Sequence, residues 1–191
     1  METKSQAQVE ALIEKVLSER KTVIVAIDGR CGAGKTTLAA ALAERFRGTV
    51  FHLDDFYLSP QQRAKRIKKE GFANADLKRF ENEVLKNISR KEPFSYFKYL
   101  PKSGTSEEVK VEVLTAVNIV EGSFCTDASL RAYFDLKIFL TAGLEQRLER
   151  LLKRKENIEE YINKWIPYEE NFFRKQGTES AADVVFDTGR E

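Results

Sequence analysis

The chain has 191 residues, of which 42% are hydrophobic and 32% charged, a balance typical of one soluble globular domain covering residues 1–191. Its 32 basic and 30 acidic residues give a formal net charge of +2, which argues against a nucleic-acid partner. Two cysteines without metal-ligand spacing exclude a disulfide framework, and the single histidine excludes most zinc sites.

The N-terminal segment is polar and carries no apolar leader, and no apolar run in the chain approaches the ~20 residues that cross a bilayer. We therefore expect a cytoplasmic protein with no membrane partner. Apolar residues from Val9 to Leu17 then recur at helical spacing, with Ser5 as a candidate cap. The apolar face of this helix would pack either on the chain's own sheet or on a second copy in a homo-oligomer.

Strand and helix patterns then alternate. Lys21 to Ile27 is β-branched and nearly all apolar, as expected of a strand buried on both faces of a parallel sheet. The alanine-rich run from Thr36 to Phe46 predicts a helix, and Thr49 to Leu53 predicts the next strand. This β-loop-α-β order predicts an α/β sheet with right-handed crossovers.

The rest of the chain continues the pattern after one polar interruption. Ser59 to Ala75 is polar and basic. Its basic stretch Arg63–Lys69 is predicted to be a solvated, mobile surface segment, and contact with a phosphorylated substrate or partner is the alternative. Phe94 to Leu100 fits either a short strand or a loop. Further strands are predicted at Val109–Leu114, Ala116–Val120, Leu136–Leu140 and Ala182–Phe186, and helices at Leu77–Ile88, Leu144–Leu152 and Ile158–Phe173, the last bent at Pro167.

The segment after the first strand matches the phosphate-loop pattern G-x-x-x-x-G-K-[ST] in full (GRCGAGKT). Its glycines let backbone N–H groups turn inward and form a nest for phosphate oxygens at a helix N-terminus. Lys35 would reach the outer phosphates, and the Thr36 hydroxyl would bind Mg²⁺. The predicted nucleotide-binding residues are Gly29, Arg30, Cys31, Gly32, Ala33, Gly34, Lys35, Thr36 and Thr37. The Cys31 side chain is expected to point away from the phosphates, with a thiol pKa lowered by the helix N-terminus as the alternative.

Carboxylates follow two of the predicted strands, Asp54 and Asp55 after one and Glu121 after the other. Ligands of open α/β sheets bind beyond the carboxyl ends of the strands. Phosphoryl transfer needs one carboxylate to activate an acceptor hydroxyl and another to hold Mg²⁺, so Asp54 is the candidate base and Glu121 the candidate metal-side group. Capping of the following turn is an equally good interpretation of Asp54 and Asp55. We expect His52 to pack within its strand.

These residues resemble the uridine kinase-like group of P-loop kinases, which includes uridine/cytidine kinases, phosphoribulokinase and nicotinamide riboside kinases. The resemblance is carried by the phosphate loop, by Asp54-Asp55-Phe56-Tyr57, by the IVEG segment that ends at Gly122 and by the closing AADVVFD, and it spans about residues 21–187. It implies a P-loop NTPase fold: three α/β/α layers around a mostly parallel sheet, with a small helical lid at about 145–175. ATP and Mg²⁺ are the implied cofactors.

The resemblance also implies residue roles. Asp54 would accept the proton of the substrate hydroxyl, Tyr57 would lie along the acceptor site, and Glu121 would stand near Mg²⁺. Arg147, Arg150 and Arg154 share one flank of the predicted lid helix, from which they would clamp the transferring phosphoryl group; a solvated helix face is the alternative.

The chain departs from this group where the group binds its nucleoside. The group's F-D-H-P-D-A-F-D-like segment corresponds to residues 71–77, which keep Phe72 and Asp76 but lack the histidine and proline. Its Y-D-F segment is represented by FSYFKY, with no aspartate after Tyr96, and its lid signature is reduced to Arg150–Lys155. Asp76 and Tyr96 are candidate acceptor-pocket residues. Kinase chemistry is thus better preserved than uridine specificity.

The leading hypothesis is an ATP-dependent kinase that transfers the γ-phosphate to an alcohol hydroxyl of a small-molecule acceptor: a nucleoside, a sugar or a vitamin-like alcohol. A nucleotide-dependent regulatory ATPase or switch is the alternative, since Val50–Asp55 also resembles a Walker-B strand. A GTPase lacks support, because Asn163-Lys164 is followed by Trp165-Ile166 rather than completing an N-K-x-D segment. A degenerate kinase is disfavoured by the intact phosphate loop and strand-end carboxylates.

Overall fold

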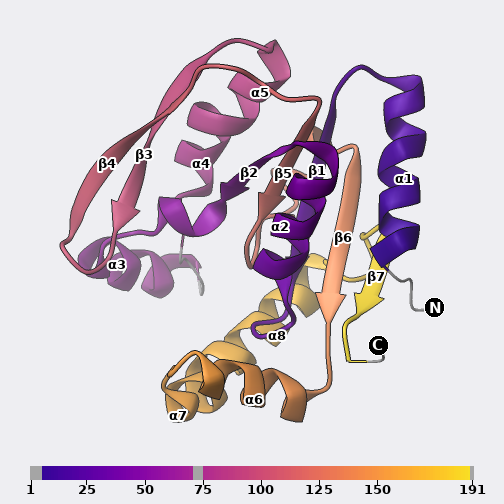
Figure 1. The fold of residues 1–191 in the computed structure, drawn as a ribbon. Helices are drawn as coiled ribbons and strands as arrows, with labels where there is room; N and C mark the ends of the chain where they lie inside the picture. Colours follow the sequence, from indigo (N-terminus) through magenta and orange to yellow (C-terminus); the bar gives the residue numbers. More distant parts are fainter. Residues whose placement is uncertain (1–5, 71–74, 190–191) are drawn as a thin grey trace.

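A computed structural model describes residues 6–70 and 75–189, so the predictions at Ser5 and Phe72 lie outside the described residues. Its centre is a parallel sheet in the order β2-β5-β1-β6-β7 (Figure 1). The strands are β1 Val23–Gly29, β2 Thr49–His52, β5 Val117–Glu121, β6 Leu136–Thr141 and β7 Val184–Asp187. The predicted α/β fold with a mostly parallel central sheet is confirmed.

Helices flank the sheet, and an antiparallel hairpin stands beside it. The helices are α1 Gln6–Glu19, α2 Lys35–Phe46, α3 Pro60–Glu70, α4 Leu77–Phe80, α5 Lys86–Arg90, α6 Leu144–Lys153, α7 Ile158–Glu160 and α8 Ile166–Gln176. Short 3-10 turns lie at Leu53–Phe56 and Arg131–Tyr133, and π-helical turns join α4 to α5 and α7 to α8 at Glu81–Leu85 and Tyr161–Trp165. The hairpin strands are β3 Phe94–Leu100 and β4 Thr105–Val111.

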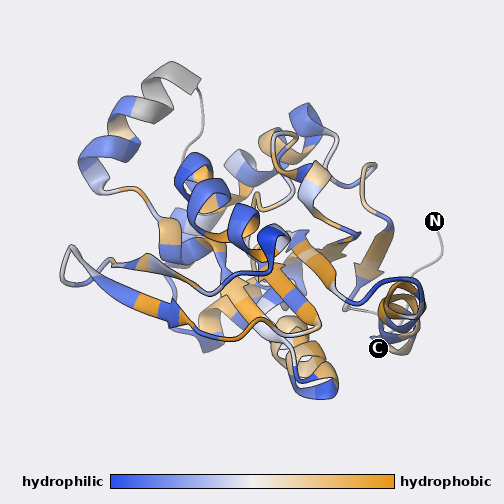
Figure 2. Cartoon of the chain, turned by 90° about the horizontal axis from the view of Figure 1, so that it is seen from above, coloured by the Kyte–Doolittle hydropathy of each residue, from blue (hydrophilic) through white to orange (hydrophobic). Residues whose placement is uncertain are grey.

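The core is divided by the sheet into two main apolar layers. On β1, Val25 and Ile27 face α1 and α2, whereas Ile24 and Ala26 face the α4–α5 run and the hairpin. Because successive strand residues point to opposite faces, this division makes every residue of β1 buried. Seen from above, the central strands are mainly orange and the outer helix faces blue (Figure 2). The predicted three-layer arrangement follows from this two-sided burial.

Helix α1 packs on the chain's own sheet through Val9 and Ile13, both fully buried. Of the two partners that the sequence allowed for the apolar face of this helix, the chain's own sheet and a second copy, the structure shows the sheet. None of the described helices is both long and apolar enough to span a membrane.

Three local predictions differ in detail from the structure. The basic stretch predicted to be a mobile surface segment lies in the regular helix α3, whose start is a capping box: Gln62 N donates to Ser59 Oγ at 3.3 Å and Ser59 N to Gln62 Oε1 at 3.0 Å. The strand predicted at Val109–Leu114 ends at Val111 and starts earlier, because it pairs with β3 along its whole length. The distortion near Pro167 is a π-helical turn that precedes the proline, which stands in the first turn of α8.

A buried carboxylate holds the functional end of the sheet together. Asp28, fully buried near the end of β1, accepts hydrogen bonds from Gly29 N at 2.7 Å and Phe124 N at 2.9 Å. It also accepts from Thr126 N at 2.9 Å and Thr126 Oγ1 at 2.7 Å. Burial raises the pKa of Asp28, and these four donors oppose the rise by stabilising the charged form. Asp28 thereby joins the start of the phosphate loop to the segment that follows β5.

Replacing Asp28 by alanine should strongly destabilise the fold, because it leaves buried N–H and O–H donors without an acceptor. We expect the free energy of unfolding, measured by urea denaturation, to fall by about 3 kcal/mol. Asp183→Ala is the control: this carboxylate binds Lys137 Nζ at 2.8 Å on a more exposed surface and should cost less than about 1 kcal/mol. Equal losses in the two variants would contradict the central role of Asp28.

Candidate active site

The phosphate loop connects β1 to α2 through glycines that adopt left-handed backbone angles. Gly32 has φ +72° and Gly34, which caps α2, has φ +95°. Gly32 also lies against α6, since a Cβ built there would come within 2.7 Å of the carbonyl oxygen of Arg147. Both positions therefore need glycine for the backbone angle, and Gly32 needs it for close packing as well. The successive turns form the concave nest that the motif predicts.

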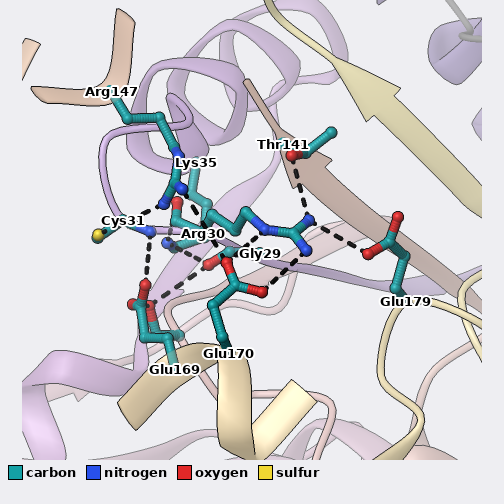
Figure 3. A network of polar contacts seen from close by, with 10 residues as sticks. Gly29, Arg30, Cys31, Lys35, Thr141, Arg147, Glu169, Glu170 and Glu179 are labelled. Carbon is teal, nitrogen blue, oxygen red and sulfur yellow. Dashed lines mark hydrogen bonds and ion pairs between the residues drawn. The ribbon is translucent and has the colours of Figure 1, made fainter. Parts of the chain in front are cut away.

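Lys35 and Thr36 begin α2 at the inner side of this loop. Lys35 Nζ donates to Gly29 O at 2.7 Å and to Arg30 O at 3.2 Å, so its ammonium group lies across the loop (Figure 3). Thr36 Oγ1 donates to Glu121 Oε2 at 3.4 Å. The ammonium group, the hydroxyl and the strand-end carboxylate predicted from sequence are therefore neighbours.

A cavity of about 300 Å³ opens beside the loop at the carboxyl ends of the strands. The predicted site residues that line it are Cys31, Gly32, Gly34, Lys35, Thr36, Asp54, Tyr57, Glu121 and Arg154. Further lining comes from Arg63 of α3, Ser123 after β5, and Tyr161, Trp165 and Glu169 of the α7–α8 run. Helices α6, α7 and α8 lie beyond the carboxyl ends of the strands (Figure 1), so the cavity stands between the sheet and these helices.

Asp54 is the carboxylate that faces the cavity from the turn after β2. Its side chain is exposed to the cavity and accepts a hydrogen bond from the Tyr57 hydroxyl. The protein atoms crowded around the carboxylate raise its pKa, and the negative charge of Glu121 adds to the rise. A carboxylate of raised pKa is a better proton acceptor than an ordinary surface aspartate.

The adjacent Asp55 has a different environment. It is buried, and its carboxylate binds Lys98 Nζ at 3.0 Å and the Tyr96 hydroxyl at 3.2 Å. These contacts join the turn after β2 to the β3–β4 hairpin. Capping thus does not describe the two aspartates well: one side chain opens to the cavity and the other ties down the hairpin.

Glu121 ends β5 and is only 5% exposed. Its Oε1 lies 2.5 Å from His52 Nδ1, and this hydrogen bond raises the pKa of His52. His52 thus lies within its strand as expected, but its ring is partly exposed and hydrogen-bonded to the Glu121 carboxylate. The pair forms because β2 and β5 are adjacent parallel strands in which residues 52 and 121 are register partners.

The three candidate lid arginines, Arg147 and Arg150 of α6 and Arg154 at its C-cap, occupy three different environments. Arg147 is buried, with Nη1 at 3.9 Å from Cys31 Sγ and Nη2 at 4.0 Å from Glu170 Oε1. Arg150 donates to Gly32 O at 3.2 Å and to Thr188, at Oγ1 2.8 Å and at O 2.9 Å. Arg154 is the one of the three that lines the cavity.

The side chain of Arg30 points out of the loop toward α8. Its guanidinium forms two hydrogen bonds with Glu170, at 2.7 and 3.0 Å, and one with Glu179 at 3.2 Å (Figure 3). It also donates to Thr141 Oγ1 at 3.1 Å and lies over the Phe139 ring, 5.2 Å from its centroid. Arg30 therefore anchors the loop to α8 through its side chain.

A second hollow, of about 460 Å³, lies on the other flank of the loop. Its lining residues include Thr37 and Leu38 of α2, Arg150 of α6, Arg154 at the C-cap of α6, and Thr188 after β7. Arg154 lines both hollows, so it stands between the two flanks of the loop.

The sequence of the chain matches a known family over most of its length. The family model described as the cytidylate kinase-like family matches residues 24–181. The chain belongs to the cytidylate kinase-like family. Uridine kinases of Anoxybacillus flavithermus and Geobacillus kaustophilus are 29% and 28% identical to it over 192 residues, in alignments that cover 89% of this chain and 88% of each relative.

A solved structure shares the fold of this chain. That of a possible uridine kinase from Bacillus stearothermophilus matches with a TM-score of 0.72 at 22% identity, covering 95% of this chain and 98% of that one. The chain is thus a uridine kinase-like P-loop kinase: an ATP-dependent small-molecule kinase whose phosphate acceptor is a hydroxyl group. The alternative of a regulatory ATPase or switch is not favoured.

Several predicted site residues of this cytidylate kinase-like protein lie away from the cavity. Asp76 caps α4 by accepting from Arg79 N at 3.1 Å, and Tyr96 is buried in the apolar layer under the hairpin; neither is among the described residues that line the cavity. Arg147 and Arg150 hold the outer side of the loop, so they neither flank the cavity with Arg154 nor form a solvated helix face.

The structure does not support the lowered pKa that the sequence offered as an alternative for the Cys31 thiol. Burial and the neighbouring Glu169 carboxylate raise its pKa to about 12, the opposite of the lowering that the helix N-terminus suggested. Desolvation and a like charge outweigh the opposing positive charges of Arg147 and Lys35. A thiol with this pKa is protonated at neutral pH.

Sequence reasoning did not assign Arg63, Trp165 and Glu169 to the site, although all three line the cavity. Arg63 was part of a charge run, yet its guanidinium lies over Tyr57, 5.7 Å from the ring centroid, and over Trp165 at 6.0 Å. Trp165, the single tryptophan, had only served to exclude a guanine-binding segment. Glu169 carries no local signal at all, because its partners lie far away in the sequence.

Paired alanine variants test the contact between the loop and α6. Both Gly32→Ala and Gly34→Ala carry the cost of a left-handed backbone, about 1–2 kcal/mol. Only at Gly32 would the new Cβ meet backbone atoms, whereas none lies within 4 Å at Gly34. We expect the melting temperature of Gly32→Ala to fall at least about twice as far as that of Gly34→Ala, measured by calorimetry. Indistinguishable melting temperatures would mean that α6 does not pack on the loop.

Proposed function

We propose that this kinase transfers the γ-phosphate of ATP, bound with Mg²⁺, to a hydroxyl group of a nucleoside. The observation that carries the proposal is the shared cavity, in which the Asp54 carboxylate faces the same space as Lys35 and Thr36 of the phosphate loop. The uridine kinases among its relatives support a nucleoside as the acceptor. Residues 145–175 are proposed to act as the lid of a single kinase domain.

The phosphates of ATP would bind backbone N–H groups of the loop from Cys31 to Thr37, because those of Gly29 and Arg30 already donate to Asp28 Oδ1 and to Leu140 O. Lys35 would exchange its loop carbonyls for the oxygens of the outer phosphates. The second hollow, beside Thr37 and Arg150, is the proposed place of the nucleoside end of ATP. Arg154 lines both hollows and would contact the polyphosphate where it passes from one to the other. It is therefore the lid arginine best placed to bind the transferring phosphoryl group.

Thr36 and Glu121 would hold Mg²⁺, since both offer oxygen ligands and their side-chain oxygens lie 3.4 Å apart. Among the described residues no group of three or more His, Cys, Asp or Glu side chains forms a metal site. This donor set fits Mg²⁺, which commonly binds one or two protein oxygens together with substrate phosphates. When bound, the ion would neutralise charge on the phosphoryl group. His52 would keep the Glu121 carboxylate in position.

Asp54 would act as the general base toward the acceptor hydroxyl. Tyr57 donates a hydrogen bond to Asp54 and fixes its orientation. The aromatic faces of Tyr57 and Trp165, bridged by Arg63, would bind the planar part of the acceptor by stacking. The acceptor would then lie between the base and the loop.

Asp54→Asn should lower kcat at least ~100-fold, because an amide cannot accept the hydroxyl proton. The affinity for ATP, measured by calorimetry, should change little. Asp55→Asn is the matched control: it weakens the contact with Lys98 and should lower stability without a comparable loss of kcat. If Asp54→Asn retained most of its turnover with the best acceptor, another group would have to be the base.

An acceptor screen tests the nucleoside assignment. ADP release by the unmodified chain would be measured with nucleosides, pentoses, pantothenate-like alcohols and nucleoside monophosphates. We expect a pyrimidine nucleoside to accelerate ADP release at least ~10-fold over water, because only the correct acceptor completes the site. Acceleration by a pentose or a nucleoside monophosphate alone would contradict this acceptor class while leaving the kinase chemistry intact.

A further inference from the structure

The carboxylate of Glu169 contacts the backbone of the phosphate loop. It projects from α8, is 6% exposed, and accepts a hydrogen bond from Cys31 N at 2.9 Å through Oε2 (Figure 3). Its Oε1 accepts from Ser123 Oγ at 2.7 Å. The side chain thus joins α8 to the phosphate loop and to the segment after β5, and it lines the cavity together with Lys35.

We propose that Glu169 is a positioning residue that competes with the terminal phosphate of ATP for the loop. The N–H of Cys31 belongs to the nest that would bind phosphate oxygens, and a single N–H serves one strong acceptor at a time. A phosphate oxygen can take this donor only when Glu169 leaves it. The inference rests on the proposed binding of ATP phosphates by the loop.

Electrostatic repulsion indicates that Glu169 opposes phosphate binding and does not assist it. A carboxylate near a polyphosphate in a partly enclosed cavity repels it, and two like unit charges about 6 Å apart at an effective dielectric constant near 20 alter an affinity by more than tenfold. The influence of Glu169 on the loop is already evident at Cys31, whose thiol pKa it helps to raise. Part of the ATP binding energy is therefore spent on moving Glu169.

The neighbouring Glu170 provides a natural contrast. It binds the Arg30 guanidinium on the outer side of the loop, while Glu169 binds the Cys31 amide on the cavity side. Helix α8 therefore holds two consecutive loop residues through two consecutive carboxylates. Only the contact of Glu169 stands where a phosphate would bind, so α8 can release the inner contact and keep the outer one.

Release of the Cys31 amide by Glu169 would also change the position of residues at the acceptor end of the cavity. Tyr161 and Trp165 lie in the π-helical turn that runs directly into α8, and both line the cavity with Glu169. A shift of α8 would therefore move the wall against which the acceptor packs. Binding of ATP and shaping of the acceptor site become linked through one helix, and by reciprocity acceptor binding would favour ATP.

Calorimetric titration with ATP and Mg²⁺ tests the competition. Glu169→Gln keeps the shape but removes the charge, so its Kd for ATP should fall about tenfold. Ser123→Ala removes one partner of Glu169 and should lower Kd about two- to threefold, a test that also stands if Glu169→Gln folds poorly. Glu170→Gln is the matched control and should not bind ATP more tightly. A purely structural role for Glu169 predicts weaker binding instead.

Fluorescence of Trp165, the single tryptophan, tests the link to the acceptor end. Addition of ATP and Mg²⁺ should change its emission in the unmodified chain and in Glu170→Gln, and the change should be at least halved in Glu169→Gln. Unchanged or weaker ATP binding by both Glu169→Gln and Ser123→Ala would overturn the inference. Failure of the unmodified chain to bind ATP would instead overturn the proposed function on which it rests.

Discussion

The buried carboxylate of Asp28 is the interaction on which the functional end of the molecule depends. It gathers donors from both sides, Gly29 at the start of the phosphate loop and Phe124 and Thr126 after β5. Without this acceptor, two irregular segments would meet at the carboxyl ends of the strands with unsatisfied buried N–H groups. With it, the loop and the segment that carries Glu121 and Ser123 form one rigid base for the cavity.

Two groups of contacts hold the loop on this base, one on its outer side and one on the side that faces the cavity. The outer side of the loop is fixed by guanidinium groups: Arg30 on Glu170, and Arg150 on Gly32 and Thr188. The inner side faces the cavity with the hydrogen bonds of Lys35 and Glu169, which a bound phosphate would replace under the proposed function. Both sides use charge-assisted contacts, and they differ in whether the proposed ligand would compete for them.

The sequence predicted most where local chemistry decides the outcome. The phosphate loop follows from its own glycines, and the buried strands follow from their apolar composition. Asp54 and Glu121 were predictable together because parallel strands bring their carboxyl ends to one edge of the sheet. The destinations of Arg147 and Tyr96 were not, since helix spacing fixes a direction but tertiary packing decides which neighbour a long side chain meets. Glu169, 138 residues away from Cys31, could only be found in three dimensions.

The π-helical turn at Tyr161–Trp165 has a consequence for how this chain can vary in length. A wide turn holds an additional residue compared with a regular α-helix, and each helical residue rotates the chain by about 100°. Deleting one residue of the wide turn would restore a uniform α-helix and largely keep the rotational phase of α8, so Glu169 and Glu170 would still face the loop they hold. A deletion in the regular turn between Trp165 and Glu169 would instead rotate both carboxylates by about 100°, away from the loop. The irregular turn is therefore the place where this segment can lose a residue without losing its contacts with the loop.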